Sequence, residues 1–259
     1  SMSALQRAHP FIYANARLVD RAAYEVVFAG APAERLIAVV QGFINPDGGF
    51  GHALEPDLRC PESQPLHTEM ALTILQQRGV RLPAIASRCC DFFAAVAAPD
   101  AALPAFLSGA LEYPAASHWQ AGFGASPTLD RTLGIVALLV WHGARHPWLD
   151  HAVHECRRHV TSATIDDAHH SLYAIQFASA LLDGETQRET LERHAAALPA
   201  AQFYVAETPV TRYGLTPLHY APYPSHPAAV LFERASIERH LDDLVGAQMA
   251  DGSWPIRFR

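Results

Sequence analysis

Three features of the sequence predict an all-α fold arranged as an α/α toroid, with an inner layer of helices enclosed by an outer one. Strand signals are scarce, because Ala and Leu dominate and alternating Val, Ile and Thr residues are few. Apolar residues recur instead at helical spacing. Helices that are apolar on one side alternate with helices that are apolar nearly all round, as two concentric layers require.

The one-sided helices are the candidates for the outer layer. In residues 148–160, Trp148, Ala152, Cys156 and Val160 are spaced four apart, and the other positions are largely charged or His. Residues 234–249 follow the same rule, with an apolar side made of Ile237, Leu241, Leu244 and Val245. Each such helix is expected to bury its apolar side and to leave the other side in water.

The candidates for the inner layer are the segments 132–141, 171–182 and 66–75, which carry few charges on any face. Proline and glycine residues mark where helices start or stop: Pro83, Pro147, Pro199, Gly79, Gly143 and Gly184. The alternation repeats about every 40–60 residues. The sequence therefore predicts a single domain over residues 1–259 with roughly five to six helical hairpins.

Composition and charge exclude several classes of function. The formal net charge is −7 and Lys/Arg runs are absent, so nucleic-acid binding is not expected. The apolar stretch Leu133–Trp141 is too short to span a bilayer. The four cysteines show neither C-x-x-C spacing nor a secretory context, which predicts a reduced, cytoplasmic protein.

Two similar loops follow amphipathic segments: "QGFINPDGGF" at 41–50 and "QMADGSW" at 248–254. Both contain Gln, then Gly-x-aromatic, and this pattern resembles the QW repeat of squalene-hopene and oxidosqualene cyclases. The "GGFG" at 48–51 also resembles the repeat loop of protein prenyltransferase β subunits, and "HPWLD" at 146–150 resembles small actinobacterial-type proteins of this superfamily. The resemblance implies a turn from an outer to an inner helix, with glycines at positive φ, a glutamine bound to helix-end groups and an aromatic ring over the joint.

The second loop is followed by only five residues, 255–259, where the resemblance implies another inner helix. Either this last inner helix is missing, or the N-terminal helix expected at about 11–28 fills its position.

The resemblance also suggests a catalytic acid. Class II terpene cyclases carry Asp-x-Asp-Asp before an inner helix, and the middle Asp protonates the substrate. In "TIDDAHH" the corresponding acid is Asp166, followed by Asp167, while Thr164 stands at the first position. Such an acid must stay protonated until it reacts, which burial and a second carboxylate favour. The alternative is that Thr164, Asp166 or Asp167 caps the helix.

Polar residues just before the expected inner helices are candidate substrate-binding groups at the mouth of a cavity. Glu55, Asp57 and Arg59 lie in the "EPDLR" loop, where they can bind a polar head group or pair internally. Other candidates are His67, near Gln64 and Glu69, and the neighbours Asp130 and Arg131. Each has a structural alternative, a hydrogen-bonded core histidine and an internal ion pair respectively.

Aromatic residues in two Pro-rich segments are further candidates. Trp119 lies between Tyr113 and Phe123, and Tyr220 between Tyr213 and Tyr223. In a cyclase, such rings shape an apolar cavity and stabilise carbocations; alternatively they cover the ends of the barrel. The second segment is long enough to form a lid.

Metal and cofactor signals are weak. His151, His154 and Glu155 match neither HExxH nor HxxEH and fall on the polar side of a helix. No DDxxD, GxSxG or phosphate-loop motif occurs. We therefore expect neither a metal nor a cofactor.

These observations lead to three functional hypotheses. The first is a cyclase-like enzyme that uses acid catalysis on a small apolar, isoprenoid-like substrate in a central cavity. The second, from a different class, is a non-catalytic binding or interaction module. The third is a hydratase, dehydratase or isomerase that acts on a terpenoid alcohol.

Overall fold

The fold is all-α. The computed structural model describes residues 2–162 and 165–257, and within these ranges the β-type pairing is limited to isolated bridges. The α-helices are α1 (Ala4–Asn15), α2 (Leu18–Phe28), α3 (Ala33–Gln41), α4 (Pro65–Gln76), α5 (Pro83–Val96), α6 (Ser117–Gln120), α7 (Leu129–His142), α8 (Pro147–Val160), α9 (Ala168–Leu181), α10 (Gly184–Ala197), α11 (Pro217–Tyr220) and α12 (Arg234–Gly246). Short 3₁₀ helices are η1 (Ser108–Glu112), η2 (Leu198–Ala200) and η3 (Pro227–Leu231).

The chain forms two compact units. Unit 1 combines Ser1–Arg21 with Thr164–Arg259, and unit 2 is the continuous stretch Ala22–Ala163, so the boundary falls within α2. Each unit has its own hydrophobic cluster. Pairing of mostly buried with half-exposed helices occurs within each unit, as the sequence predicts, while closure into a toroid stays a prediction.

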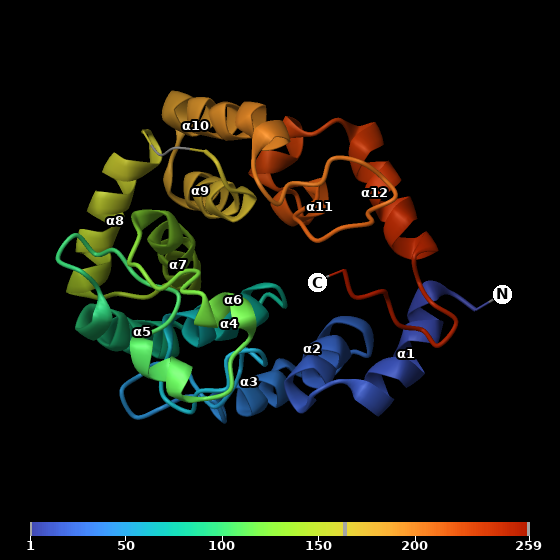
Figure 1. The fold of residues 1–259 in the computed structure, drawn as a ribbon, viewed down its shortest axis with the longest axis horizontal. Helices are drawn as coiled ribbons and strands as arrows, with labels where there is room; N and C mark the ends of the chain where they lie inside the picture. Colours follow the sequence, from blue (N-terminus) through green and yellow to red (C-terminus); the bar gives the residue numbers. More distant parts are fainter. Residues whose placement is uncertain (1, 163–164, 258–259) are drawn as a thin grey trace. The chain divides into compact units, whose positions relative to one another are not determined.

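Unit 2 contains the helix that is most completely buried. Every residue of α7 from Thr132 to Leu139 is buried, in agreement with the prediction for this segment. Helix α8 packs along α7 and buries Ala152, Cys156 and Val160 as predicted, whereas Leu149 is buried in place of Trp148, which is half-buried. Helices α5 and α8 begin with the prolines that mark their first turn. Figure 1 shows α3, α5 and α8 flanking α4 and α7.

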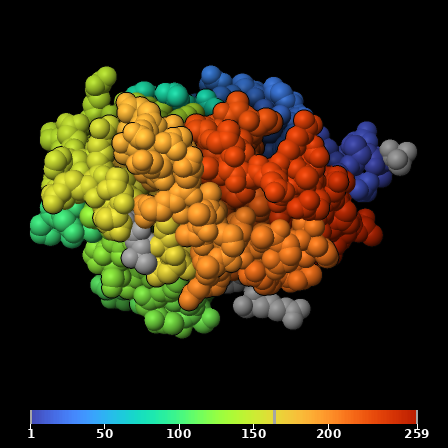
Figure 2. Space-filling model, turned by 90° about the horizontal axis from the view of Figure 1, so that it is seen from above, coloured from blue at the N-terminus to red at the C-terminus, as the bar shows by residue number. Residues whose placement is uncertain are grey.

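Unit 1 repeats this pairing, with helices of similar length except for α11. Helix α10 packs on α9, and α12 packs on α11, which has a single turn. In Figure 1 the red C-terminal segment lies beside α1, so both ends of the chain belong to this unit. The orange residues before α12 and the red residues of α12 form one continuous surface in Figure 2.

The two similar loops fold into the same turn. In the first loop, Asp47 Oδ1 accepts hydrogen bonds from Gly49 N at 3.0 Å and Ser63 Oγ at 2.7 Å. In the second, Asp251 Oδ1 accepts from the N–H of Ser253 at 3.0 Å and from its Oγ at 2.7 Å. In both, an aspartate thus fixes the turn by holding the backbone N–H two residues later and a serine hydroxyl.

Each turn presses a glycine against a helix. Gly48 and Gly252 both have φ of +90°. A Cβ on Gly48 would lie 2.2 Å from the carbonyl oxygen of Arg88 in α5, and one on Gly252 would lie 2.1 Å from that of Arg7 in α1. Both conformation and space therefore require glycine.

Two sequence-based expectations about helices are wrong. The single N-terminal helix expected at 11–28 is two helices, because Ala16 adopts an extended conformation (ψ 150°) after α1 ends at Asn15. In α12 the helical period is correct, but Leu241 and Leu244 are each 47% exposed, whereas His240 is 3% exposed. The buried side of α12 is the one that carries His240, whose ring is hydrogen-bonded to the carbonyl of Ala206.

Within the described residues, no helix is both long enough and apolar enough to cross a bilayer.

Candidate functional site

The proposed acid pair lies at the start of α9. The Asp166 side chain is 74% exposed, and its Oδ1 lies 3.9 Å from His170 Nδ1. Asp167 is the N-cap of α9, where its Oδ1 accepts from His169 N at 2.7 Å. Thr164, the third residue of the pattern, lies outside the described residues.

The surroundings of Asp167 favour its charged form. Burial raises the pKa of this carboxyl, but hydrogen bonds from the side chain and backbone of His169 outweigh the burial and lower the pKa below its usual value. An ionised carboxylate cannot donate a proton, and the Asp166 side chain extends into solvent rather than into a cavity. The geometry therefore supports helix capping, the alternative reading of this motif.

The "EPDLR" loop is hydrogen-bonded to the segment that contains Trp119. Asp57 Oδ1 accepts from Trp119 Nε1 at 2.8 Å, and its Oδ2 lies 3.5 Å from His118 Nε2. Arg59 donates its backbone N–H to Pro114 and its side chain is exposed, while Glu55 is half-buried. Trp119 is only 9% exposed and is thus a core residue of unit 2.

His67 is a core histidine. It is fully buried in α4, and its Nε2 donates to the carbonyl of Leu58 at 2.9 Å. Burial lowers its pKa to about 4, so the ring is neutral. Its Nδ1 has no hydrogen-bond partner among the described residues.

Asp130 and Arg131 each contact another helix of unit 2. Arg131 in α7 reaches Glu69 in α4 at 2.9 Å, with both side chains 13% exposed. Asp130 meets His159 Nε2 of α8 at 2.7 Å. These contacts join helices within unit 2, so both residues have structural roles.

Tyr220 is buried in unit 1, where its hydroxyl donates to the carbonyl of Ala168 at 2.7 Å. Its predicted role as a substrate contact would require a path to a 1% exposed side chain. Tyr213 from the same segment is at the surface, and its hydroxyl lies 3.0 Å from His169 Nε2.

Two histidines of α8 contact protein groups rather than forming part of a metal-binding cluster. His151 Nε2 donates to the carbonyl of Pro99 at 3.0 Å, and His154 lies 3.9 Å from Glu155. In the parts of the chain that the structure describes, no group of three or more His, Cys, Asp or Glu side chains is arranged to hold a metal ion.

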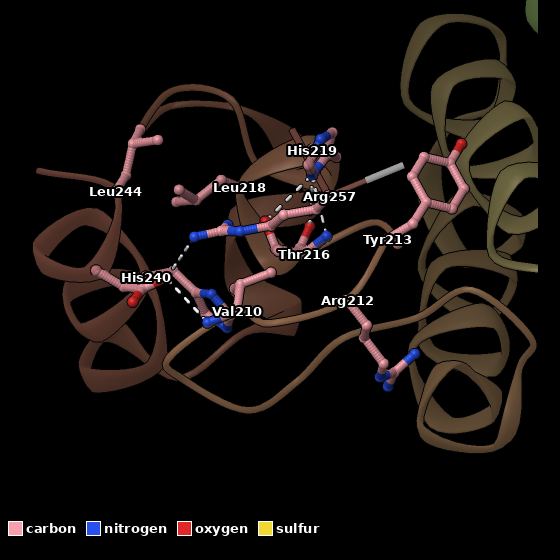
Figure 3. Close-up of a pocket in the computed structure, with 11 residues that line it drawn as sticks. Val210, Arg212, Tyr213, Thr216, Leu218, His219, His240, Leu244 and Arg257 are labelled. Carbon is pink, nitrogen blue, oxygen red and sulfur yellow. Dashed lines mark hydrogen bonds and ion pairs between the residues drawn. The ribbon is translucent and has the colours of Figure 1, made fainter. Parts of the chain in front are cut away.

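A pocket of about 330 Å³ opens in unit 1 between residues 210–216, α11, α12 and Arg257. Cavities of this size hold small molecules. Its apolar walls are Val210, Leu218 and Leu244. Figure 3 shows His219 of α11 and His240 of α12 on different walls, with the Arg257 side chain lying between them.

The charged groups of the pocket are largely engaged with one another. Asp243 Oδ2 accepts from Val210 N at 3.1 Å and lies 4.0 Å from the guanidinium of Arg257. At the rim, Arg212 pairs with Glu207 at 3.2 Å. The imidazoles of His219 and His240 also line the pocket, and that of His240 is bonded to the carbonyl of Ala206.

The sequence predicts only part of this site. The segment 212–224 stands out in the sequence for its tyrosines, and it does supply one wall, although His219 rather than Tyr220 faces the pocket. His240 and Arg257 carry no motif. No pattern in the sequence marks either residue as part of a pocket.

Comparison with known proteins yields a fold relationship. The sequence matches no known family and no curated protein. A crystal structure of a protein from Actinoplanes is similar to this chain, with a TM-score of 0.57 and 16% sequence identity, over 98% of this chain and 83% of that one. At this identity the similarity concerns the fold alone.

Proposed function

We propose that this chain is a small-molecule binding protein whose ligand occupies the pocket of unit 1. The observation that carries the proposal is the pocket itself, which has a volume of about 330 Å³ and apolar walls of Val210, Leu218 and Leu244. Small-molecule sites are concave, mostly apolar and of this order of volume. Two of its charged groups, Asp243 and Arg257, lie 4.0 Å apart.

Acid catalysis by Asp166 and Asp167, the cyclase-like hypothesis, has less support. Protonation of an alkene needs a buried, neutral carboxylic acid, whereas Asp166 is 74% exposed and Asp167 has a lowered pKa. The binding module is therefore the better supported of the three hypotheses. The likeness to terpenoid cyclases and prenyltransferases, together with the toroid, remains a proposal about ancestry that the repeated turn supports.

The proposed setting is the cytoplasm. It is supported by the four cysteines, which are all buried and unbridged.

Two substitutions on α12 form a matched test. Leu244 and Leu241 are each 47% exposed, but Leu244 alone lines the pocket. Melting temperatures would be measured with a panel of small alcohols, carboxylates, amines and sugars. Compounds that stabilise the wild type are expected to stabilise Leu241→Trp equally and Leu244→Trp not at all, because the indole introduced in the second variant would fill the pocket. Stabilisation that persists in Leu244→Trp would show that the ligand binds elsewhere.

A further inference from the structure

Three side chains of unit 1 form a continuous series of hydrogen bonds. His169 lies in the first turn of α9, and its Nδ1 is 3.1 Å from Oδ1 of Asp167, the N-cap of the same helix. On the other side of the ring, His169 Nε2 is 3.0 Å from the hydroxyl of Tyr213. Tyr213 belongs to the segment before α11, so the fold brings a distant hydroxyl to the start of α9.

The contacts of His169 determine which of its ring nitrogens carries the proton. The Asp167 carboxyl has a pKa below its usual value, so it is ionised and can only accept a hydrogen bond. Nδ1 of His169 is therefore the donor to Asp167, and Nε2 of the neutral ring has a lone pair. The Tyr213 hydroxyl donates to this lone pair. His169 is thus placed as a base for the proton of Tyr213.

Neighbouring rings hold this geometry at the surface of the protein. The Tyr213 ring is nearly parallel to the imidazole of His169, with an interplanar angle of 21° and centroids 6.0 Å apart. Phe203 packs edge-on against both rings, at 5.8 Å from His169 and 5.9 Å from Tyr213. Tyr213 is nevertheless 38% exposed, and Figure 3 shows its hydroxyl directed away from Arg257. The hydrogen bond between His169 and Tyr213 is itself exposed, so a reagent can reach it from solvent.

From this geometry we infer that Tyr213 is a nucleophile that accepts acyl groups, with His169 as its general base and Asp167 as the residue that positions the base. A carboxylate, an imidazole and a hydroxyl in the same series activate the serine of Ser-His-Asp enzymes. The Tyr213 oxygen attacks the carbonyl carbon of an activated acyl compound, and its proton passes to His169 Nε2. The leaving group departs with the electron pair of its bond and takes up that proton. The product is an O-acyl tyrosine, and the inference does not depend on the ligand proposed for the pocket.

Tyr223 provides an internal comparison. It is 53% exposed and therefore more accessible than Tyr213. Its ring meets His226 edge-on with centroids 5.2 Å apart, but among the described residues its hydroxyl has no imidazole within hydrogen-bond distance. His226 Nδ1 accepts instead from the backbone N–H of Ala228 at 3.2 Å. Exposure alone thus predicts faster acylation of Tyr223, whereas assistance by a base predicts faster acylation of Tyr213.

Acetylation of the full chain by N-acetylimidazole at neutral pH distinguishes these expectations. Mass spectrometry of peptides from samples quenched over time would give the rate at each tyrosine. We expect Tyr213 to react at least about 10-fold faster than Tyr223, because a positioned base accelerates reactions by about 10²–10⁴-fold in enzymes. Equal rates, or a faster reaction at Tyr223, would overturn the inference.

Three variants separate the base from its surroundings. His169→Gln removes the base and should slow acetylation of Tyr213 by about 10-fold or more, with no change at Tyr223. His170→Gln, at the next residue, is the matched control and should change neither rate. Asp167→Asn keeps the helix cap but removes the charge that stabilises the imidazolium, so it should slow Tyr213 while most of the stability is retained. A Tyr213 rate that is unchanged in His169→Gln would overturn the inference, and one unchanged in Asp167→Asn would overturn the positioning role.

Discussion

Among single residues, Gly48 and Gly252 are the ones that the fold can least replace. Each combines a positive φ with close contact to the backbone of a neighbouring helix. A side chain there would meet a carbonyl oxygen that belongs to a helix and cannot move alone. The same steric requirement at both positions explains why the two loops have similar sequences.

Replacement of Gly48 by Ala should be far more destabilising than the same change at Gly79. Both glycines have positive φ, but a Cβ on Gly79 meets nothing within 4 Å. We expect a loss of about 1 kcal/mol for Gly79→Ala, from backbone conformation alone, and about 3 kcal/mol or more for Gly48→Ala. Urea unfolding of the two variants would measure the difference, and equal losses would contradict the described turn.

The buried His67 makes stability depend on pH. Its pKa is 6.5 when unfolded and about 4 when folded. Between these values the unfolded chain binds the extra proton, so the free energy of unfolding falls as the pH falls from 6.5 to 4. The loss from this residue is about 3 kcal/mol.

Urea unfolding of wild type and His67→Gln across that pH range checks this prediction. Gln retains the donor to Leu58 but does not titrate, so the variant should lose about 3 kcal/mol less on acidification. His154→Gln, at a histidine whose side chain is 68% exposed, serves as the control. Parallel pH profiles for wild type and His67→Gln would refute the buried, neutral state of His67.

At the level of elements, helix α9 shows how one motif is divided between two roles. Asp167 caps the helix, whereas Asp166 extends into solvent. Asp167→Ala should cost about 1 kcal/mol of stability, and Asp167→Asn should restore most of it, because Asn is an equivalent cap. Asp166→Ala should change stability by less than about 0.5 kcal/mol. Thermal unfolding of the three variants decides between this division and a pair that acts as one unit.

Helix positions are predictable because they follow local rules. The apolar period of α8 and the prolines that begin α5 and α8 are properties of a few adjacent residues. The buried side of α12 is not predictable in this way. Its apolar residues Leu241 and Leu244 remain half exposed, because packing on α11 and the bond from His240 to Ala206 set the rotation of the helix.

For the whole molecule, the division into two units has a consequence for folding. Unit 2 is continuous in sequence, whereas unit 1 needs residues from both ends of the chain. Gln248 Nε2 donates to the carbonyl of Ala4 at 2.9 Å, and Gly252 packs against Arg7. The second turn is therefore incomplete without α1.

A fragment of residues 22–162 should fold cooperatively, since it contains its own core. A fragment of residues 165–257 should unfold with a broad transition, and addition of a peptide of residues 2–21 should sharpen it. Circular dichroism during thermal unfolding would follow both. Cooperative unfolding of 165–257 alone, unaffected by the peptide, would contradict the role given to α1.

The candidate site is the least predictable feature, because its parts meet only in the folded chain. His219, His240 and Arg257 are spread over the last part of the sequence and match no motif. The polar residues that the sequence analysis selects by their place before helices, such as Asp57 and Arg131, have partners inside unit 2. A loop or helix start that is rich in polar groups thus has the same appearance in the sequence whether those groups stabilise the fold or bind a ligand.

The central claim is that a small molecule binds in the pocket that Leu244 lines. Melting temperatures of the wild type, Leu241→Trp and Leu244→Trp across the panel of small compounds test it most directly. We predict that compounds which stabilise the wild type also stabilise Leu241→Trp but not Leu244→Trp. Stabilisation that persists in Leu244→Trp would contradict the account.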